Sequence, residues 1–272
     1  MATLNEALET IEDGSFRHIV NISGGKDSAA LAIYLAQEYP QLPAEYVFCD
    51  TGVELPETYE YLDRLEAILG QEIVRLNALD LLGMKKKPGR NPFDIWLNEY
   101  YGGYLPNPGA RWCTRVLKIK PFEDYIGEDR AFSYIGIRGD EDREGYLGKD
   151  QKPPKISDKN NIVPVYPFKD DELGIADIKS VLEANGVGLP DYYEWRSRSG
   201  CYFCFYQQLG EWQGLQENHP ELFEKAKKYE KIESGKHFTW NQDRSLGQIE
   251  NLEERYQVKN PDEIDSCAIC HL

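Results

Sequence analysis

The stretch Ser23-Gly24-Gly25-Lys26-Asp27-Ser28 decides the fold, because it joins a short apolar run to a helical pattern. The preceding Arg17–Ile22 (RHIVNI) predicts a buried strand, and the following AALAIYLAQEYP predicts a helix that stops at Pro40. Two adjacent glycines let backbone N–H groups approach an anion without Cβ collisions, and the start of a helix adds unpaired N–H groups. With the Lys26 ammonium and the two serine hydroxyls, the turn predicts a phosphate site.

Strands and helices alternate on both sides of this turn. Further strands are predicted at Glu45–Cys49, Glu72–Leu76 and Phe132–Ile137, and a helix is predicted to begin at Pro56 and end at Gly70. Such alternation with apolar strands is typical of an α/β fold whose parallel sheet is covered on both faces. Its ligands bind beyond the carboxyl ends of the strands.

The chain is expected to change character near residue 205. Beyond that point no strand is predicted, and helices are predicted to begin at Pro220 and after Ser245. We therefore expect two parts, a nucleotide-binding α/β domain over residues 1–204 and a helical, cysteine-bearing C-terminal extension over residues 205–272.

Charge limits the classes of partner. The 272 residues hold 31 Lys+Arg and 47 Asp+Glu, a net charge of −16, which argues against a surface that binds nucleic acid or anionic membrane as a whole. Residues 84–120 are the exception, with 8 bases and 2 acids. Within them Lys85–Lys87 and Arg90 are expected to be a solvated charge run, and Arg111–Lys120 is expected to attract anions.

Neither a membrane span nor a secretory signal is predicted, so we expect a cytoplasmic protein. In that reducing compartment the six cysteines are expected to be ligands, nucleophiles or core residues. Cys49 continues an apolar strand and is expected in the core. Two CxxC pairs, Cys201/Cys204 and Cys267/Cys270, form a complete Cys₄ zinc set, although 62 residues separate them, far more than in ordinary zinc modules.

Four segments together resemble a known family. SGGKDS resembles the PP-loop of the ATP pyrophosphatases, and three further segments resemble their phosphoadenosine-phosphosulfate (PAPS) reductase-like branch. These are Cys49-Asp50-Thr51-Gly52 followed by VELPETYEY, Arg111-Trp112-Cys113-Thr114-Arg115 with Lys118 and Pro121, and the run GIRGDEDR from Gly136 to Arg143. The resemblance extends from residue 17 to about residue 204.

The resemblance implies a Rossmann-like sheet of the adenine nucleotide alpha-hydrolase type that binds ATP or PAPS, with Mg²⁺ accompanying ATP. It implies that Lys26 is catalytic and that the nucleotide is contacted by Ser23, Gly24, Gly25, Lys26, Asp27, Ser28, Asp50, Thr51, Gly52 and Arg138. An arginine suits such a role because its guanidinium is a rigid, permanently charged fork.

The resemblance also bears on the cysteines. Relatives that carry a [4Fe–4S] cluster hold it with the equivalents of Cys113, Cys201 and Cys204, and the fourth ligand here is Cys270, Cys267, a non-cysteine group or nothing. Thr114 stands where the adenosine-phosphosulfate reductases have a second adjacent cysteine. The tail Ser266-Cys267-Ala268-Ile269 loosely resembles the nucleophilic tail of sulfonucleotide reductases, which makes Cys267 a candidate nucleophile.

Three functions remain open. The first is an ATP pyrophosphatase coupled to sulfur transfer, similar to the DNA phosphorothioation enzymes, with a sulfur donor such as a cysteine desulfurase. Its nucleic-acid acceptor would enter through residues 84–120 or come with a partner protein. The second is a PAPS or adenosine-phosphosulfate reductase that uses Cys267 and thioredoxin. The third is a nucleotide-sensing subunit without turnover of its own.

Overall fold

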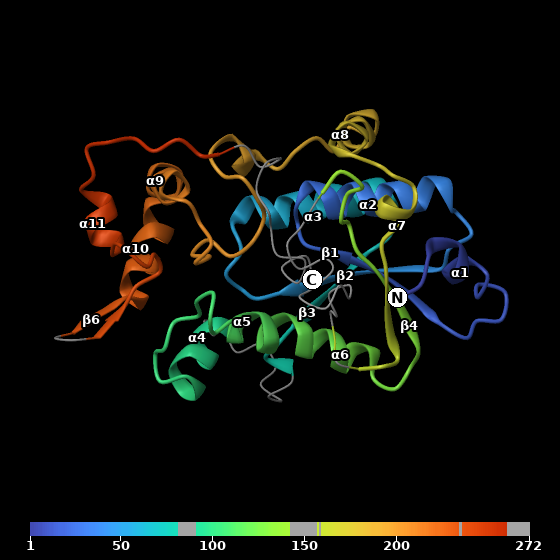
Figure 1. Ribbon diagram of the computed structural model, residues 1–272, viewed down its shortest axis with the longest axis horizontal. Coiled ribbons are helices and arrows are strands. Elements are labelled where there is room, and N and C mark those ends of the chain that lie inside the picture. The colour runs from blue at the N-terminus through green and yellow to red at the C-terminus, as the bar shows by residue number, and fades with distance from the viewer. Residues whose placement is uncertain (81–90, 142–156, 158, 234–235, 260–272) are drawn as a thin grey trace.

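Five parallel strands form the central sheet of the computed structural model, which describes residues 1–80, 91–141, 157, 159–233 and 236–259. Their order is β3-β2-β1-β4-β5, so the chain starts in the middle of the sheet and fills one side before the other (Figure 1). The strands are β1 (Arg17–Ile22), β2 (Ala44–Asp50), β3 (Ile73–Asn77), β4 (Ala131–Tyr134) and β5 (Ile162–Val165). This order confirms the α/β, Rossmann-like parallel sheet and puts a ligand crevice at the carboxyl ends of β1 and β4.

Helices cover both faces of the sheet (Figure 1). One face carries α2 (Lys26–Glu38), α3 (Pro56–Leu69) and α8 (Ile175–Ala184), and the other carries α5 (Trp112–Thr114), the π-helical turn η3 (Arg115–Ile119) and α6 (Lys120–Ile126). The remaining helices are α1 (Leu4–Leu8), α4 (Pro92–Ile95), η2 (Trp96–Tyr100), α7 (Pro167–Asp170), η4 (Asp191–Glu194), α9 (Leu209–Asn218), α10 (Pro220–Tyr229) and α11 (Leu246–Glu250).

Alternate residues of each strand supply the two cores. Val20 and Phe48 pack toward α2 and α3 together with the buried Leu31 and Leu62. Ile19 and Val47 point the other way and pack with residues of η3 and α6, among them Phe122. Because both faces of β1 are buried, its register is fixed by burial on either side.

The two helices next to the phosphate loop begin and end at identifiable signals. Helix α3 starts with Pro56 at its first turn and ends at Gly70, whose φ of 65° is left-handed, as the sequence predicts. Helix α2 begins at Lys26, earlier than its apolar pattern suggests. The side chains of Lys26, Asp27 and Ser28 therefore lie on its first turn, where N–H groups lack helical partners.

Several predicted boundaries were wrong. The fourth strand ends at Tyr134 because the chain turns there, with the Ile137 N–H donating to the Ile135 carbonyl at 3.0 Å. Strand β5, which was not predicted, carries Pro164 and lies at the edge of the sheet, where a residue without N–H is tolerated. The apolar pattern after Ser245 predicts a helix that continues to Tyr256, but the helix ends at Glu250.

The expectation that strands stop after residue 205 was also wrong. A short antiparallel hairpin follows α10, formed by β6 (Lys231–Glu233) and β7 (Lys236–Phe238). Its first strand has one apolar residue between two charged ones. The strand therefore forms through backbone pairing and shows no hydrophobic run that a sequence pattern could detect.

A third core joins the C-terminal helices to the rest of the molecule. It includes Trp212, Phe223 and Trp240 from the C-terminal part and Phe93 and Trp112 from the part before residue 204. The division at residue 204 stays a prediction. Among the described residues, no helix is both long enough and apolar enough to cross a membrane.

Gly24 offers a test of how tightly the phosphate loop is packed. Its φ is 74°, and a Cβ there would lie 2.5 Å from the Thr58 methyl group, whereas a Cβ on Gly70 would meet nothing within 4 Å. We predict that Gly70→Ala lowers the free energy of unfolding by about 1 kcal/mol, because alanine is strained in the left-handed conformation. Gly24→Ala should cost at least about 2 kcal/mol more, because overpacking adds to the same strain. Urea unfolding of both variants measures this, and equal losses would contradict the packing argument.

Candidate functional site

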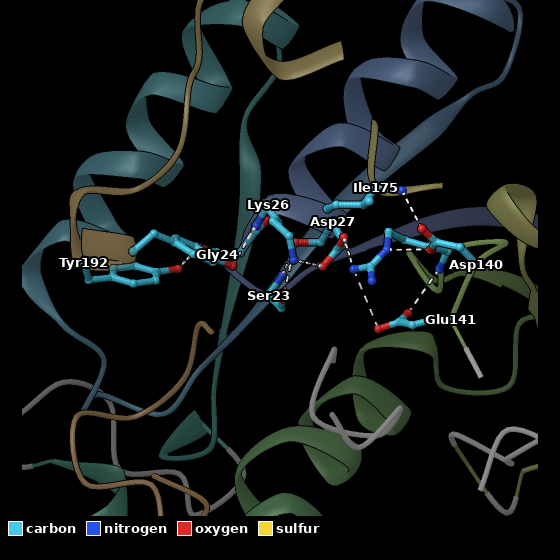
Figure 2. A network of polar contacts seen from close by, with 12 residues as sticks. Ser23, Gly24, Lys26, Asp27, Asp140, Glu141, Ile175 and Tyr192 are labelled. Atoms are coloured by element: carbon cyan, nitrogen blue, oxygen red, sulfur yellow. Dashed lines mark hydrogen bonds and ion pairs between the residues drawn. The ribbon is translucent and has the colours of Figure 1, made fainter. Parts of the chain in front are cut away.

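The phosphate loop is held open by its own hydrogen bonds. The Ser28 hydroxyl accepts the Ser23 N–H at 3.0 Å and lies 3.1 Å from the Gly25 carbonyl oxygen, to which it donates. From outside the loop, the Tyr192 hydroxyl donates to the Gly24 carbonyl at 2.6 Å (Figure 2). These bonds fix the turn between β1 and the start of α2, and a turn that leads into a helix N-terminus is a common anion-binding arrangement.

Asp27 joins the two cationic side chains of the site. One of its carboxylate oxygens lies 3.1 Å from Lys26 Nζ and the other 3.2 Å from Arg138 Nη1. All three residues are more than nine-tenths buried, with exposed fractions of 5%, 6% and 3% for Lys26, Asp27 and Arg138. A shared carboxylate offsets the cost of burying two cations that no ligand yet neutralises.

The loop after β4 completes the network (Figure 2). Arg138 Nε donates to Asp140 at 2.9 Å, and the Arg138 backbone N–H donates to Glu141 at 3.2 Å. The other oxygen of Asp140 accepts the N–H of Ile175, the first residue of α8, at 2.9 Å. The neighbouring carboxylates raise the pKa of Arg138 above its already high usual value, so it stays a cation.

A second buried polar cluster follows β2. Asp50 accepts the N–H of Gly52 and the hydroxyl of Tyr59, both at 2.8 Å. Thr51 donates to Glu54 at 2.6 Å and lies 3.4 Å from the Cys201 sulfur. Burial, and then the charge of Asp50, raise the pKa of Glu54 to about 6.

One cavity connects the phosphate loop to three cysteines. From the loop it is lined by Ser23, Gly25, Lys26 and Asp27, and from the loop after β4 by Arg138 and Glu141. Cys113, Cys201 and Cys204 line the same cavity, together with Thr51, Thr114, Lys118, Tyr193, Arg198 and Tyr206. The structure thus brings together four of the six predicted phosphate-loop residues, the predicted arginine and three of the predicted metal ligands, although Cys113 lies about ninety residues from the CxxC pair. The other predicted nucleotide contacts, apart from Thr51, are not part of this lining: Gly24, Ser28, Asp50 and Gly52.

The four described cysteines are free thiols, and they differ in surroundings. Burial raises the pKa of Cys49 to about 12, and this residue belongs to the core under the sheet, as predicted. Burial also raises the pKa of Cys113 to about 11 and that of Cys201 higher still, while the nearby Lys118 ammonium acts in the opposite direction. Arg198 lies 3.8 Å from the Cys204 sulfur. Thiolates in this cavity therefore need a cationic partner.

Aromatic side chains of the third core hold the CxxC turn in place through Phe203. Phe203, between Cys201 and Cys204, stacks on Trp240 with ring centroids 4.6 Å apart and meets Phe93 at 4.4 Å. Because Phe203 is buried in the third core, the two cysteines on either side of it are presented to the cavity by a rigid turn.

Some predicted residues fall outside the description. Cys267 and Cys270, and with them the Cys₄ zinc set and the nucleophilic tail, lie beyond residue 259, and Lys85–Lys87 and Arg90 lie in the undescribed residues 81–90. Within the described ranges, no group of three or more His, Cys, Asp or Glu side chains is arranged to hold a metal ion.

The motifs missed several residues that line or surround the cavity. Tyr193 and Ser199 belong to no pattern that the sequence singles out, and Glu54 lies in the VELPETYEY segment without a role assigned to it. Tyr193 and Ser199 line the cavity, and Glu54 contacts Thr51, which also lines it. Tyr193 precedes the CxxC pair by eight residues. Its position close to the pair, in a segment that also holds Arg196 and Arg198, was the one sequence signal that could have pointed to it.

This geometry defines the class of protein: a parallel α/β protein in which the turn after β1, predicted to bind phosphate, shares one cavity with three thiols. Residues 17–207 match the family model of the phosphoadenosine phosphosulfate reductase domain. The chain belongs to this family, which is part of the PP-loop superfamily of adenine nucleotide alpha-hydrolases, and the resemblance seen in its motifs is confirmed.

The individual relatives and solved structures share less than a third of their aligned residues with this chain. An uncharacterized protein of Methanocaldococcus jannaschii is 26% identical over 211 residues, which cover 76% of this chain and 40% of that protein. A tRNA-specific 2-thiouridylase of Actinobacillus succinogenes is 28% identical over 134 residues, covering 46% of this chain and 32% of that enzyme. The phosphoadenylyl-sulfate reductase structure from Candida auris aligns with a TM-score of 0.48 at 13% identity, covering 74% of this chain and 88% of that one. The chain spans 40% of the length of this Methanocaldococcus jannaschii protein and 50% of the length of a second uncharacterized protein from the same organism.

The raised pKa of Glu54 makes a pH-dependent prediction. Its folded-state pKa of about 6 exceeds the ordinary 4.5, so the folded protein holds this proton more tightly than the unfolded chain does. The stability that Glu54 contributes therefore falls as pH rises from about 4.5 to about 6. Glu54→Gln keeps an oxygen that accepts from Thr51 but carries no titrating proton. Relative to the wild type, it should gain about 2 kcal/mol between pH 4 and pH 7.

Urea unfolding across this pH range measures the difference. Glu60→Gln, at an exposed position of α3, is the matched control and should show no such gain. A wild-type–variant difference that is flat in pH would contradict the burial of a titrating Glu54.

Proposed function

We propose that this protein is an ATP pyrophosphatase that couples cleavage of ATP, between its α- and β-phosphates, to sulfur transfer. The observation that carries the proposal is the single cavity shared by the phosphate loop and three cysteines. An activated acceptor formed beside the loop would meet a sulfur nucleophile without leaving the cavity, so water would have little chance to hydrolyse it first.

The loop residues supply the phosphate chemistry. The N–H groups at the start of α2, the Lys26 ammonium and the Arg138 guanidinium bind the phosphates and stabilise negative charge as it develops. An acceptor oxygen attacks the α-phosphorus, the bond to the β-phosphate oxygen breaks, and pyrophosphate leaves with the electron pair. A sulfur nucleophile then displaces AMP from the acceptor. Asp27, freed from one of its cations by the phosphates, is placed to hold the Mg²⁺ that accompanies ATP.

The three cysteines of the cavity fit an iron–sulfur cluster. A four-iron cluster is wider than a single ion, so its ligands do not have to converge on one point, and thiolates are the donors it requires. Cys113, Cys201 and Cys204 would hold it, and Lys118 and Arg198 would balance their negative charge. When bound, the cluster would supply iron that binds sulfide. Cys270 remains our proposal for the fourth ligand, and a zinc ion is the alternative metal.

The remaining parts of the reaction are also proposals. The reduced thiols suit a cytoplasmic protein, and the sulfur would come from a donor such as a cysteine desulfurase. A nucleic-acid acceptor would have to approach through the basic residues between 84 and 120 or be delivered by a partner, because the net charge of −16 repels it elsewhere. The thiouridylase among the relatives acts on tRNA, which favours an acceptor of this class.

The family model favours one alternative, a sulfonucleotide reductase. In that reaction the Cys267 thiolate attacks the sulfur of PAPS, the nucleoside phosphate leaves, and thioredoxin thiols release sulfite by reducing the thiosulfonate. The phosphate loop and Arg138 would serve either substrate, so substrate turnover separates the two reactions.

The first test follows pyrophosphate and sulfite from ATP and PAPS side by side under anaerobic conditions. We predict pyrophosphate from Mg·ATP once the acceptor or partner is present, and no sulfite from PAPS with thioredoxin. Lys26→Ala should weaken nucleotide binding at least about tenfold, because it removes a charged partner of the phosphates. Lys225→Ala, at an exposed position of α10, should bind normally. Sulfite release that depends on Cys267 would replace this proposal with the reductase.

The second test concerns the cluster. Anaerobically purified protein should contain iron and sulfide and absorb visible light, and Cys201→Ser should lose both iron and colour because it removes a cavity thiolate. Cys49→Ala is the matched control, since Cys49 is buried under the sheet and should leave the iron content unchanged. Zinc in place of iron, or iron retained in Cys201→Ser, would overturn the assignment.

A further inference from the structure

The segment that leads to the CxxC pair packs against the phosphate loop. It begins with the turn η4 and reaches Gly200. Besides the hydrogen bond from Tyr192 to the Gly24 carbonyl, the loop is so close to this segment that a Cβ on Gly25 would lie 2.7 Å from the Ser199 hydroxyl and 3.2 Å from that of Tyr193. Figure 2 shows Tyr192 directed at Gly24. The glycines of the loop therefore make room for this segment as well as for a phosphate.

Tyr193 occupies the position of an anion. Its hydroxyl oxygen accepts the backbone N–H of Lys26 at 3.3 Å, and its ring lies 5.8 Å from the Lys26 ammonium nitrogen. Lys26 is the first residue of α2, so its N–H is among those that have no helical partner and that bind phosphate in such loops. The tyrosine oxygen thus contacts a backbone donor of the kind that binds a phosphate oxygen at a helix N-terminus.

The same hydroxyl can also donate. Burial, and then the charge of Asp27, raise the pKa of Tyr193 far above its usual value, so it keeps its proton. A phosphate oxygen that takes the Lys26 N–H arrives beside this O–H, and a hydrogen bond to a charged oxygen is stronger than the long bond that it replaces. Exchange of one bond for the other therefore favours the bound state.

The rest of the segment links Tyr193 to a cysteine. The Arg196 N–H donates to the Tyr192 carbonyl at 2.9 Å, which makes the turn compact. The Arg196 guanidinium, buried with 1% of the residue exposed, donates to the Gly200 carbonyl at 3.1 Å and to the Cys201 carbonyl at 2.8 Å. Arg196 thus connects the carbonyl of Tyr192, the neighbour of Tyr193, to the carbonyl of Cys201 through hydrogen bonds.

We propose that Tyr193 is a further ligand of the nucleotide phosphate, and that the segment from Asp191 to Gly200 carries the effect of nucleotide binding to the CxxC pair. The inference rests on the proposed function, because it requires a nucleotide at the phosphate loop. It adds a residue that no motif marks and gives the two halves of the cavity a physical connection. Sulfur chemistry at Cys201 and Cys204 would then respond to the presence of the nucleotide.

The first experiment measures the affinity of the full chain for Mg·ATP by calorimetry. Tyr193→Phe should bind about tenfold more weakly, the loss expected for one hydrogen bond to a charged group. Tyr61→Phe is the matched control, because it removes a buried hydroxyl that donates to the Gly188 carbonyl, and it should bind as the wild type does. Equal affinity of Tyr193→Phe would overturn the inference. Tighter binding would overturn it too, since the hydroxyl would then be a competitor of the phosphate.

The second experiment follows backbone hydrogen exchange by mass spectrometry, a readout that a purely structural role of Tyr193 would not separate in this way. In the wild type, ATP should slow exchange in peptides that cover residues 23–28 and 201–207. In Tyr193→Phe at saturating ATP, only the first region should be slowed. Slowing of both regions in the variant would overturn the coupling.

Failure of the proposed function gives a different result. A wild type that binds neither ATP nor PAPS overturns the proposed function and this inference together. A wild type that binds PAPS alone, with the same dependence on Tyr193, overturns the ATP reaction and supports the role of Tyr193.

Discussion

The ion pairs of Asp27 are the interaction on which the site depends. Asp27 lies between Lys26, the first residue of α2, and Arg138, from the loop after β4, and its carboxylate helps to offset the cost of burying both cations. The same contacts connect the turn after β1 to the loop after β4, and Asp140 extends the connection to the start of α8. These contacts connect the two loops at the crevice at the carboxyl ends of the strands, and under the proposed function a phosphate would have to replace ion pairs of Lys26 and Arg138.

A ligand that replaces those pairs changes more than local charge. Under the proposed function, Asp27 would lose partners when phosphate binds Lys26 and Arg138, which would leave a buried carboxylate for a divalent cation to satisfy. Phosphate and metal would then stabilise each other in this site. The cysteines present a parallel case, because burial holds their protons until a cation compensates the thiolates.

The local part of the site was predictable and the long-range part was not. SGGKDS between a strand and a helix specifies a phosphate turn through glycine geometry and helix N–H groups, and the strand pattern was sufficient for the parallel sheet. The meeting of Cys113 with Cys201 and Cys204 depends on how a separate core packs, which no local pattern encodes, and their assignment came from family resemblance. Tyr193 was missed because it acts through a tertiary contact with the Lys26 N–H, and Glu54 was missed because its raised pKa depends on burial, which a local pattern does not show. The β6–β7 hairpin was missed because its first strand has one apolar residue between two charged ones.

The aromatic stack behind the CxxC turn has a consequence for how the chain can be divided. The family match ends at residue 207, but Phe203 packs on Trp240, thirty-seven residues later. A fragment cut at the end of the match would expose the rings of Phe93, Trp112 and Phe203 and would lose the wall that supports the two cysteines. The C-terminal helices are therefore not an exchangeable accessory. The CxxC cysteines and the C-terminal helices that support them form one unit, so both would have to be transferred together into another protein.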